Sequence, residues 1–242
     1  MQPTNLELTP DGKHYTDGKQ LYQRVTTYLK ERLLPHFDTE AKAKEMAGKG
    51  KYALYGYQEI LDEWARNGKA ATDRGTEIHD FIEAYLTNGI PAYTMSEAFT
   101  SNLCKFLDKL LIDTAKHGFS LHCEQALKSD ELLLAGTTDL FLFDGSTLVV
   151  RDWKTNQHKP IHDAPTYNKF MHHPYHLPLN DYAKHTAQLN IYARMIIEQG
   201  ICPQKVDLGV YWIDNCGKVE LIKSPYMPDR TAALLPAKII SN

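Results

Sequence analysis

The sequence predicts an α/β or α+β domain in which helices flank a mixed sheet, and a change of hydrophobic period carries that prediction. Apolar residues follow a helical period up to about residue 116 and then alternate with polar residues, as in strands. A helical segment at 181–199 precedes two strand-like segments at 205–213 and 218–223, and a short helix ends the chain. Helices, strands, a helix and further strands in this order are typical of a sheet covered by helices.

The first part of the chain is expected to be an extension of that domain. Residues 1–20 are polar and contain glycine, so we expect them to be loosely ordered. Residues 22–67 are predicted to form helical segments that break near Pro35 and Gly48–Gly50. The predicted units are a helical extension over residues 1–70 and a core over residues 71–242.

The core is predicted to begin with two amphipathic helices, at 74–87 and 96–116. Asn88-Gly89 ends the first of them. Asp144-Gly145 is a strong signal for a hairpin between two strands. The predicted strands are 119–123, 131–143 and 147–154, and the segment 155–180, rich in proline and histidine, is predicted to be a functional loop.

Composition argues against several classes of protein. No apolar run approaches the roughly 18 residues that cross a membrane, and the N-terminal residues lack the apolar segment of a secretory signal. We therefore expect no membrane partner. The four cysteines show no CxxC pair and no zinc-like spacing, so we expect reduced thiols and a cytoplasmic location. These cysteines are Cys104, Cys123, Cys202 and Cys216.

The net charge of −3 does not by itself indicate nucleic-acid binding, which usually leaves a basic surface. One segment departs from this average, because lysines are interleaved there with tyrosines: Lys42, Lys44, Lys49, Lys51, Tyr52, Tyr55 and Tyr57. Such a segment could neutralise phosphates and stack on bases, whereas a solvated helix face explains the same charges.

The predicted hairpin brings two aspartates and a lysine onto one face of the sheet. With a two-residue turn at Asp144-Gly145, Asp139 faces Val150. Asp139 then lies diagonally from Asp152, with the two backbones about 7–8 Å apart. Lys154 shares this face, because side chains alternate along a strand.

Acidic and basic side chains on a buried strand are costly unless they are paired or bind a metal. One interpretation is a structural ion pair between Lys154 and either aspartate. The other is a site for Mg²⁺ or Mn²⁺, which prefer hard oxygen ligands. Such a cation lowers the pKa of a bound water, and a lysine beside it can stabilise developing negative charge. That combination suits hydrolysis of a phosphodiester bond.

These residues resemble those of a known family. Asp139 followed by Asp152-Trp153-Lys154 is similar to the core of the PD-(D/E)xK nucleases, in the branch that includes the RecB nuclease domain. Thr138 stands where the family name has proline, and Gly136 precedes it, as is typical of this branch. The resemblance extends to Arg74-Gly75-Thr76-Glu77-Ile78-His79, to Glu124, to the QxxxY motif Gln188-Leu189-Asn190-Ile191-Tyr192 and, for small mitochondrial genome-maintenance and phage exonucleases, to Val25-Thr26-Thr27-Tyr28 with Phe37-Asp38.

The resemblance implies a restriction-endonuclease-like core and a metal-dependent deoxyribonuclease that uses one or two Mg²⁺ or Mn²⁺ ions. Gln188 would brace the site, and Tyr192 would touch a phosphate or stack near the scissile bond. Because side chains alternate along a strand, the Trp153 side chain is expected to pack on the face opposite Asp152. The clustered cysteines of iron–sulfur relatives are missing, so no such cluster is expected. The implied residues are Lys154, Asp139, Asp152 and Glu124 for catalysis, His79, Asp139, Asp152 and Trp153 for the metal, and Gln188, Tyr192, Lys49, Lys51 and Tyr52 for DNA.

Three functions are compatible with these residues. The first is an exonuclease on single-stranded DNA ends, in which the N-terminal extension forms an arch through which a strand is threaded. The second is a structure-specific endonuclease on the same core. The third is a nucleic-acid-binding module without activity, against which the intact Asp139, Asp152 and Lys154 argue.

Overall fold

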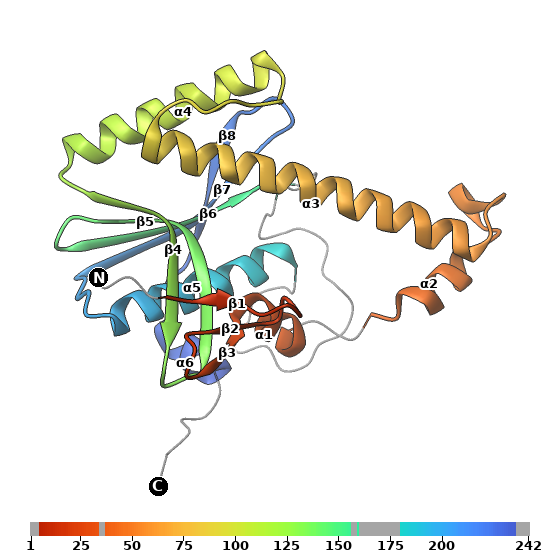
Figure 1. The fold of residues 1–242 in the computed structure, drawn as a ribbon, viewed down its shortest axis with the longest axis horizontal. Helices are drawn as coiled ribbons and strands as arrows, with labels where there is room; N and C mark the ends of the chain where they lie inside the picture. Colours follow the sequence, from red (N-terminus) through yellow and green to blue (C-terminus); the bar gives the residue numbers. More distant parts are fainter. Residues whose placement is uncertain (1–4, 34–36, 156–158, 160–179, 236–242) are drawn as a thin grey trace, which may run out of the picture.

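A mixed sheet lies between two layers of helices (Figure 1). The computed structural model describes residues 5–33, 37–155, 159 and 180–235. Within them, the strands follow the order β1-β2-β3-β5-β6-β7-β8, with β4 paired to β5. The predicted fold class is therefore confirmed.

Five strands form the centre of the sheet. The predicted strands are present with shifted ends, and β4 is longer than expected because it continues past residue 123. β6 and β7 run parallel, and the other neighbours among these strands run antiparallel. The central strands are β4 (Ser120–Ser129), β5 (Leu134–Phe143), β6 (Thr147–Lys154), β7 (Lys205–Ile213) and β8 (Val219–Ser224).

The N-terminal residues join this sheet, so the expectation of a loosely ordered start is wrong for residues 5–20, and the predicted helical segment from residue 22 begins with a strand. They form β1 (Glu7–Leu8), β2 (His14–Thr16) and β3 (Leu21–Arg24). β3 pairs in parallel with the beginning of β5, where Gln23 lies opposite Leu134. Helix α1 (Val25–Leu33) follows directly and packs into the core, which makes this segment part of the central domain.

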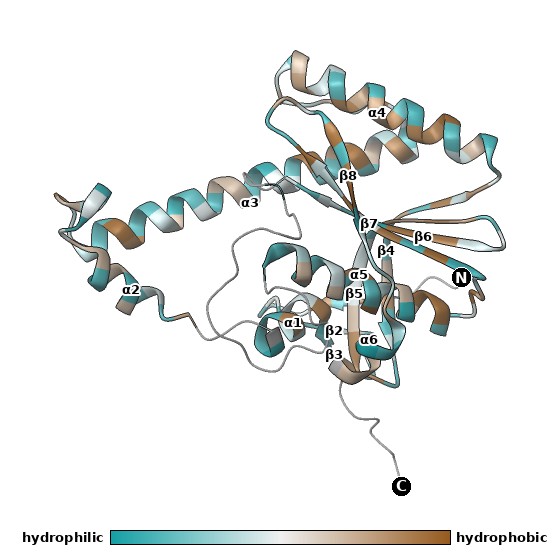
Figure 2. Cartoon of the chain, turned by 180° about the vertical axis from the view of Figure 1, so that it is seen from behind, coloured by the Kyte–Doolittle hydropathy of each residue, from teal (hydrophilic) through white to brown (hydrophobic). Residues whose placement is uncertain are grey.

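Each face of the sheet has its own apolar cluster. On one face, α3 (Tyr57–Asn88) and α4 (Glu97–Lys116) bury Ile78, Leu103 and Leu107 against β5, β6 and β7. On the other face, α5 (Asp181–Glu198), α1 and α6 (Pro228–Leu234) cover the cluster around Phe141. Figure 2 shows apolar segments on the central strands and alternating apolar and polar residues along α3 and α4. No helix in the described ranges is long and apolar enough to span a membrane.

A segment that we call the arm, residues 37–70, projects from the domain (Figure 1). It contains α2 (Thr39–Met46), the short 3-10 helix η1 (Gly50–Tyr52) and the start of α3, which pack together around Ala43, Tyr52 and Ile60. α3 runs without a break across residue 70, from the tip of the arm into the core. Residues 65–74 of α3 are all exposed, so no other part of the domain covers this stretch.

A polar cluster fastens the N-terminal strands to the β4–β5 turn. The buried Tyr22 hydroxyl lies 2.5 Å from Asp130 Oδ1 and 3.1 Å from Asp17 Oδ2. Lys128 Nζ lies 3.0 Å from the same hydroxyl. We expect Tyr22→Phe to lower the free energy of unfolding by about 1 kcal/mol, because three partly or fully exposed charged groups lose a shared hydrogen-bond partner. Thermal denaturation measures this, with exposed Tyr93→Phe as the control. An unchanged melting temperature for Tyr22→Phe would contradict the fastening role.

Candidate metal centre

β5 offers one edge to two different strands, and the site lies where they separate. Near its end, β5 pairs with β6 through Leu140–Phe143, and near its start it pairs with β3 through Leu134 and Ala135. Between these pairings β6 diverges from β5. There, Asp139 Oδ2 accepts a hydrogen bond from the backbone N–H of Trp153, at 2.7 Å. The side chain of Asp139 thus takes the place of a backbone partner and is fixed at the opening.

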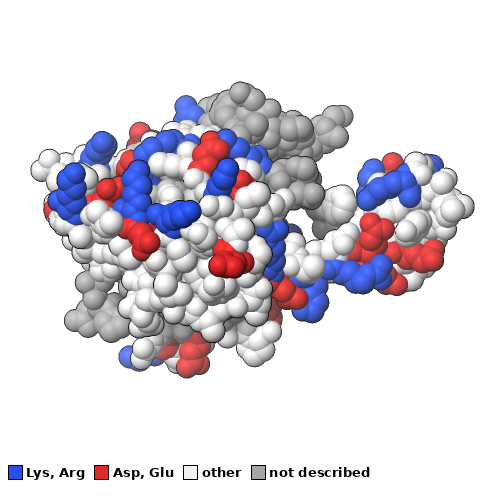
Figure 3. Space-filling view, turned by 90° about the horizontal axis from the view of Figure 1, so that it is seen from above, with Lys and Arg blue, Asp and Glu red and all other residues white. Residues whose placement is uncertain are grey.

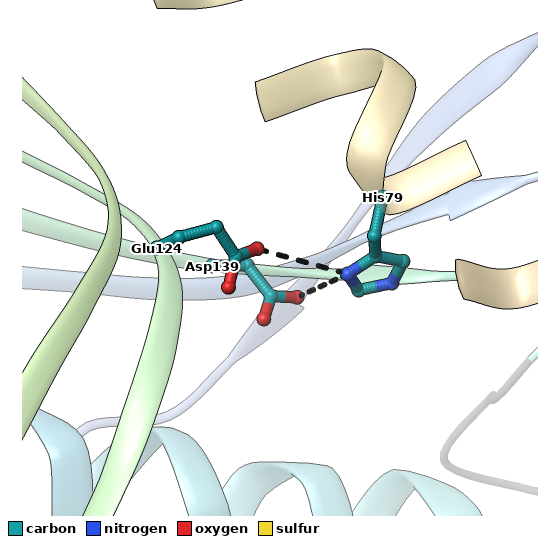
Figure 4. Close-up of side chains that lie close together, drawn as sticks. All are labelled: His79, Glu124 and Asp139. Atoms are coloured by element: carbon teal, nitrogen blue, oxygen red, sulfur yellow. Dashed lines mark ion pairs between the residues drawn. The ribbon is translucent and has the colours of Figure 1, made fainter. Parts of the chain in front are cut away.

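Three side chains meet at this opening from three different elements (Figure 4). His79 comes from α3, Glu124 from β4 and Asp139 from β5. His79 Nδ1 lies 3.9 Å from Glu124 Oε1 and 3.7 Å from Asp139 Oδ2. One potential ligand atom from each residue lies within 4.8 Å of the other two, so the set could hold a metal ion.

The backbone at Glu124 explains how its carboxylate reaches this group. Cys123 pairs with Leu140 and Gln125 pairs with Thr138, so the register of β4 on β5 is unchanged across Glu124. Glu124 itself has φ 42°, in the left-handed region that non-glycine residues rarely adopt. Such strain is concentrated at functional positions. The Glu124 side chain approaches His79 instead of facing solvent.

Trp153 contributes its backbone to the opening and its side chain to the core. Its carbonyl oxygen lies 3.2 Å from His79 Nε2, the ring nitrogen that does not face Glu124 and Asp139. The predicted role of Trp153 as a metal ligand is therefore replaced by an orienting one, because its carbonyl can accept from Nε2–H and leave Nδ1 free for an ion. The indole is buried and stacks on Tyr211, with ring centroids 4.9 Å apart. The expectation that the Trp153 side chain packs on the face opposite Asp152 is confirmed.

Asp152 and Lys154 form a second group beside the first. Lys154 Nζ lies 2.5 Å from Asp152 Oδ2, and the Gln188 amide on α5 donates to Asp152 Oδ1 at 3.1 Å. Asp152 is buried, whereas the Lys154 side chain keeps 20% of its surface exposed. This contact holds the Asp152 carboxylate from the side of α5. The ligand set gathered around His79 contains Glu124, however, and not Asp152.

Burial and neighbouring charges act differently on the two aspartates. Burial and the Asp152 carboxylate raise the pKa of Asp139 to about 7, although His79 and Lys154 oppose the shift. Burial also disfavours the charge on Asp152, but Lys154 outweighs it and lowers the pKa of Asp152. Burial lowers the pKa of His79, but Glu124 and the two aspartates outweigh it, so the pKa of His79 is raised. The unrelieved repulsion therefore falls on Asp139.

This asymmetry predicts opposite effects of two matched amide substitutions in EDTA. The Asp139 carboxyl has a pKa of 3.8 when unperturbed and about 7 in the folded protein, so stability is lost as pH rises through this window. We expect Asp139→Asn to raise the free energy of unfolding by about 1–4 kcal/mol at pH 8 and by much less at pH 4. Asp152→Asn should lower it, because Lys154 then lacks its counter-charge. Melting curves at both pH values measure these changes, and equal effects of the two substitutions would contradict the assignment.

The hairpin register differs from the predicted one. Phe143 pairs with Leu148, which places Asp139 opposite Asp152 if the same register is continued, and not opposite Val150. The cause is that four residues, Asp144 to Thr147, lie between the paired Phe143 and Leu148, and Asp144 Oδ1 accepts hydrogen bonds there from the N–H groups of Ser146 and Thr147. Both registers leave the aspartates on one face.

Two tyrosines that were expected to contact DNA are buried. Tyr192 is 3% exposed and packs under Gly136, where a Cβ would come within 2.9 Å of the tyrosine ring. Tyr52 is 2% exposed, and its hydroxyl accepts a hydrogen bond from Trp64 Nε1 at 2.8 Å. Neither ring can stack on a base in this structure. Both tyrosines instead hold structure together, Tyr192 below the site and Tyr52 inside the arm.

The two predicted lysines lie on the arm, away from the three grouped ligands. Lys49 and Lys51 are exposed, and Lys51 Nζ lies 3.7 Å from Glu63 Oε1. Figure 3 shows both signs of charge on the arm, so its surface is not uniformly basic. The arm also exposes the rings of Tyr55 and Tyr57, which are 43% and 41% exposed, and Lys44 Nζ lies 5.3 Å from the centroid of the Tyr57 ring.

His185 lies beyond the histidine-rich segment 155–180 and belongs to a helix. It lies on α5, is 4% exposed, and precedes Gln188 by one helical turn. Its spacing of three residues from the QxxxY motif was the available signal. Most of the loop predicted at 155–180, including His158, His162, His172, His173 and His176, lies outside the described residues.

Comparison with known proteins finds no relative: no family model matches the chain, and no curated protein sequence matches it. The function is therefore inferred from the side chains gathered at the site.

Proposed function

We propose that this protein is a metal-dependent deoxyribonuclease that hydrolyses phosphodiester bonds, starting from the ends of single-stranded DNA. The observation that carries the proposal is the meeting of His79, Glu124 and Asp139 beside the Asp152–Lys154 pair, where β5 and β6 diverge. A purely structural ion pair needs only Asp152 and Lys154. Such a pair does not account for the imidazole of His79 or for the carboxylates of Glu124 and Asp139. It also leaves unexplained why Asp139 lies close enough to Asp152 to be repelled by it.

The donor set fits a divalent cation that accepts oxygen and nitrogen ligands. His79 Nδ1 and the carboxylates of Glu124 and Asp139 lie close enough together to share an ion, and the Trp153 carbonyl can fix the ring by accepting from Nε2–H. Carboxylate oxygens suit Mg²⁺ and Mn²⁺, and an imidazole favours Mn²⁺ further. A bound cation would also neutralise the charge that raises the pKa of Asp139. When bound, it supplies an acidified water and a counter-charge for phosphate oxygens.

Lys154 and Gln188 have separate tasks in this proposal. The Lys154 side chain is 20% exposed, and its ammonium can donate to a phosphate oxygen as negative charge develops there. Hydrolysis then forms a bond between the water oxygen and phosphorus, breaks the bond to the leaving sugar oxygen, and transfers one proton of the water to that sugar oxygen. Gln188 keeps the Asp152 carboxylate oriented from the opposite side. The lysine thus acts on the reacting group, while the glutamine acts through Asp152.

The path of the chain around the site supports a preference for single-stranded ends. The arm follows α1, which packs with α5 on one face, and it returns through α3, which packs with α4 on the other face. His79 belongs to α3 and Gln188 to α5, so the site lies between the two ends of this span. An arm that passes beside the site would admit a threaded single strand more easily than a wide duplex. Exposed lysines and tyrosines on the arm are suited to sequence-independent contacts with it.

End-labelled single-stranded and duplex DNA, incubated with Mg²⁺, Mn²⁺ or EDTA, tests the proposal. We expect the labelled single-stranded DNA to shorten with either cation. We expect neither DNA to be cut in EDTA, and neither to be cut by the Asp139→Asn protein. Mn²⁺ should raise the wild-type melting temperature. At a Mn²⁺ concentration one hundred times its dissociation constant, the free energy of unfolding should increase by about 2.7 kcal/mol. Cleavage in EDTA, or the absence of both cleavage and a Mn²⁺-dependent shift, would overturn the proposal.

A further inference from the structure

His185 lies on the face of α5 that covers the candidate metal centre. It precedes Gln188 by three residues, so the two side chains lie on the same side of the helix. The Gln188 amide donates directly to Asp152, which places His185 one helical turn from the Asp152–Lys154 pair. The imidazole is 4% exposed. A buried histidine here is part of the wall of the site.

Neither ring nitrogen of His185 has a hydrogen-bond partner in the described part of the chain. Buried polar groups are nearly always hydrogen-bonded, so two unpartnered nitrogens on one side chain need an explanation. Burial and the nearby Lys154 charge lower the pKa of His185 to about 3, so the ring is neutral at pH 7. A neutral imidazole carries one donor and one acceptor nitrogen. The acceptor suits a cationic donor.

The charged groups that act on His185 come from two elements. Lys154 and Asp152 belong to β6, while Lys184 and Asp181 belong to α5. Lys184 Nζ lies 2.8 Å from Asp181 Oδ1, so these two satisfy each other. Lys154 has only the Asp152 carboxylate as an ion-pair partner among the described residues. Asp152 is not one of the three grouped ligands of the metal-free structure, but its charge acts directly on Asp139. A cation held by Asp139 would therefore also attract the Asp152 carboxylate, and Lys154 would lose its partner if Asp152 turned toward that cation.

We propose that His185 is a positioning residue for Lys154: its acceptor nitrogen receives the Lys154 ammonium when a divalent cation occupies the site and draws on Asp152. This inference rests on the proposed function. In the metal-free protein Lys154 stays on Asp152, and the imidazole remains without a partner. With the cation present, the neutral ring supplies an acceptor without adding charge. Lys154 is thereby held where it can donate to a phosphate oxygen.

Two substitutions of His185 separate this role from simple packing. His185→Phe keeps a ring of similar shape and removes both nitrogens, whereas His185→Gln keeps an acceptor. Melting curves of the full chain with EDTA and with Mn²⁺, and the rate of shortening of linear single-stranded DNA, are compared with wild type. The control is Thr186→Val, on the same helix as His185, which removes the contact between Thr186 Oγ1 and Ser224 Oγ on β8.

We expect His185→Phe to melt no lower than wild type in EDTA, because it removes only unpartnered polar atoms. Its Mn²⁺-dependent gain in melting temperature should shrink, and kcat should fall about 10–100-fold with little change in KM, the range typical for residues that orient a metal site. His185→Gln should recover part of both. Thr186→Val should lower the melting temperature equally with and without Mn²⁺.

Two results would overturn the positioning role while leaving the nuclease proposal intact. One is a His185→Phe protein with wild-type kcat and an unchanged Mn²⁺ gain. The other is a loss of stability in EDTA as large as that in Mn²⁺, which indicates packing alone. If the wild type itself neither cuts DNA nor gains stability with Mn²⁺, the proposed function fails, and the positioning role fails with it.

Discussion

Lys154→Ala is expected to reduce DNA cleavage by about 10²–10³-fold, the cost of losing one preorganised contact to developing charge. Lys154 Nζ is the ammonium group placed against Asp152, and Lys154 is not one of the three grouped ligands. Binding of Mn²⁺ should therefore persist, and the Mn²⁺-dependent rise in melting temperature should remain. Single-turnover cleavage and melting curves measure the two effects. Lys116→Ala, at the exposed end of α4, is the control.

Two outcomes for Lys154→Ala would be informative against the proposal. Wild-type turnover would remove Lys154 from the chemistry altogether. A loss of the Mn²⁺ response equal to that of Asp139→Asn would mean that the lysine acts by organising the ligands. Lys154 would then be part of a structural ion pair, with no contact to the phosphate.

Circular single-stranded DNA is expected to survive under conditions in which a linear strand is shortened from one end. If the arm closes over the strand, a circle offers no end to pass beneath it. The measurement uses the same sequence in both forms, with products resolved by length. Rapid nicking of the circle, or equal digestion of blunt duplex, would favour an endonuclease and exclude threading.

Salt dependence tests the arm separately from the chemistry. Each phosphate contact on a single strand contributes about 0.7 to the slope of log affinity against log salt, so removal of two contacts should reduce the slope by about 1.4. The double substitution Lys49→Ala, Lys51→Ala makes this change on exposed positions. The pair Lys116→Ala, Lys105→Ala on α4 is the matched control. An unchanged slope for the arm variant would place the DNA path elsewhere.

The central elements of the fold could be predicted because burial leaves a periodic mark in the sequence. Strands β5 and β6 and helix α5 lie between two layers, and their apolar residues are spaced accordingly. Strands β1 and β2 leave no such mark, because they are short and polar and gain their order from pairing with neighbours. The continuity of α3 was also hidden, since its exposed middle has no apolar stripe and contains Gly68.

Part of the site was hidden for a different reason. The pairing of Lys154 with Asp152 follows from the alternation of side chains along β6, and this part of the site was predictable. The approach of Glu124 to His79 depends on one left-handed backbone angle, which no residue pattern reveals. The burial of Tyr52 and Tyr192 depends on tertiary contacts with Trp64 and Gly136. Residue type identified these positions as important, but only packing decides whether a ring faces solvent.

The long helix α3 carries two regions with different resistance to local opening. Residues 65–74 are exposed on all sides and depend on the helix's own hydrogen bonds, whereas Ile78, Phe81 and Ile82 are buried. Arg74 marks the boundary, because its Nη1 donates to Asn215 Oδ1 at 2.9 Å. Amide hydrogens on the outer side of Arg74 should exchange by fraying, and those on the inner side only by global unfolding. A strand that bridges the arm and the domain would slow the outer exchange and leave the amides around His79 unchanged.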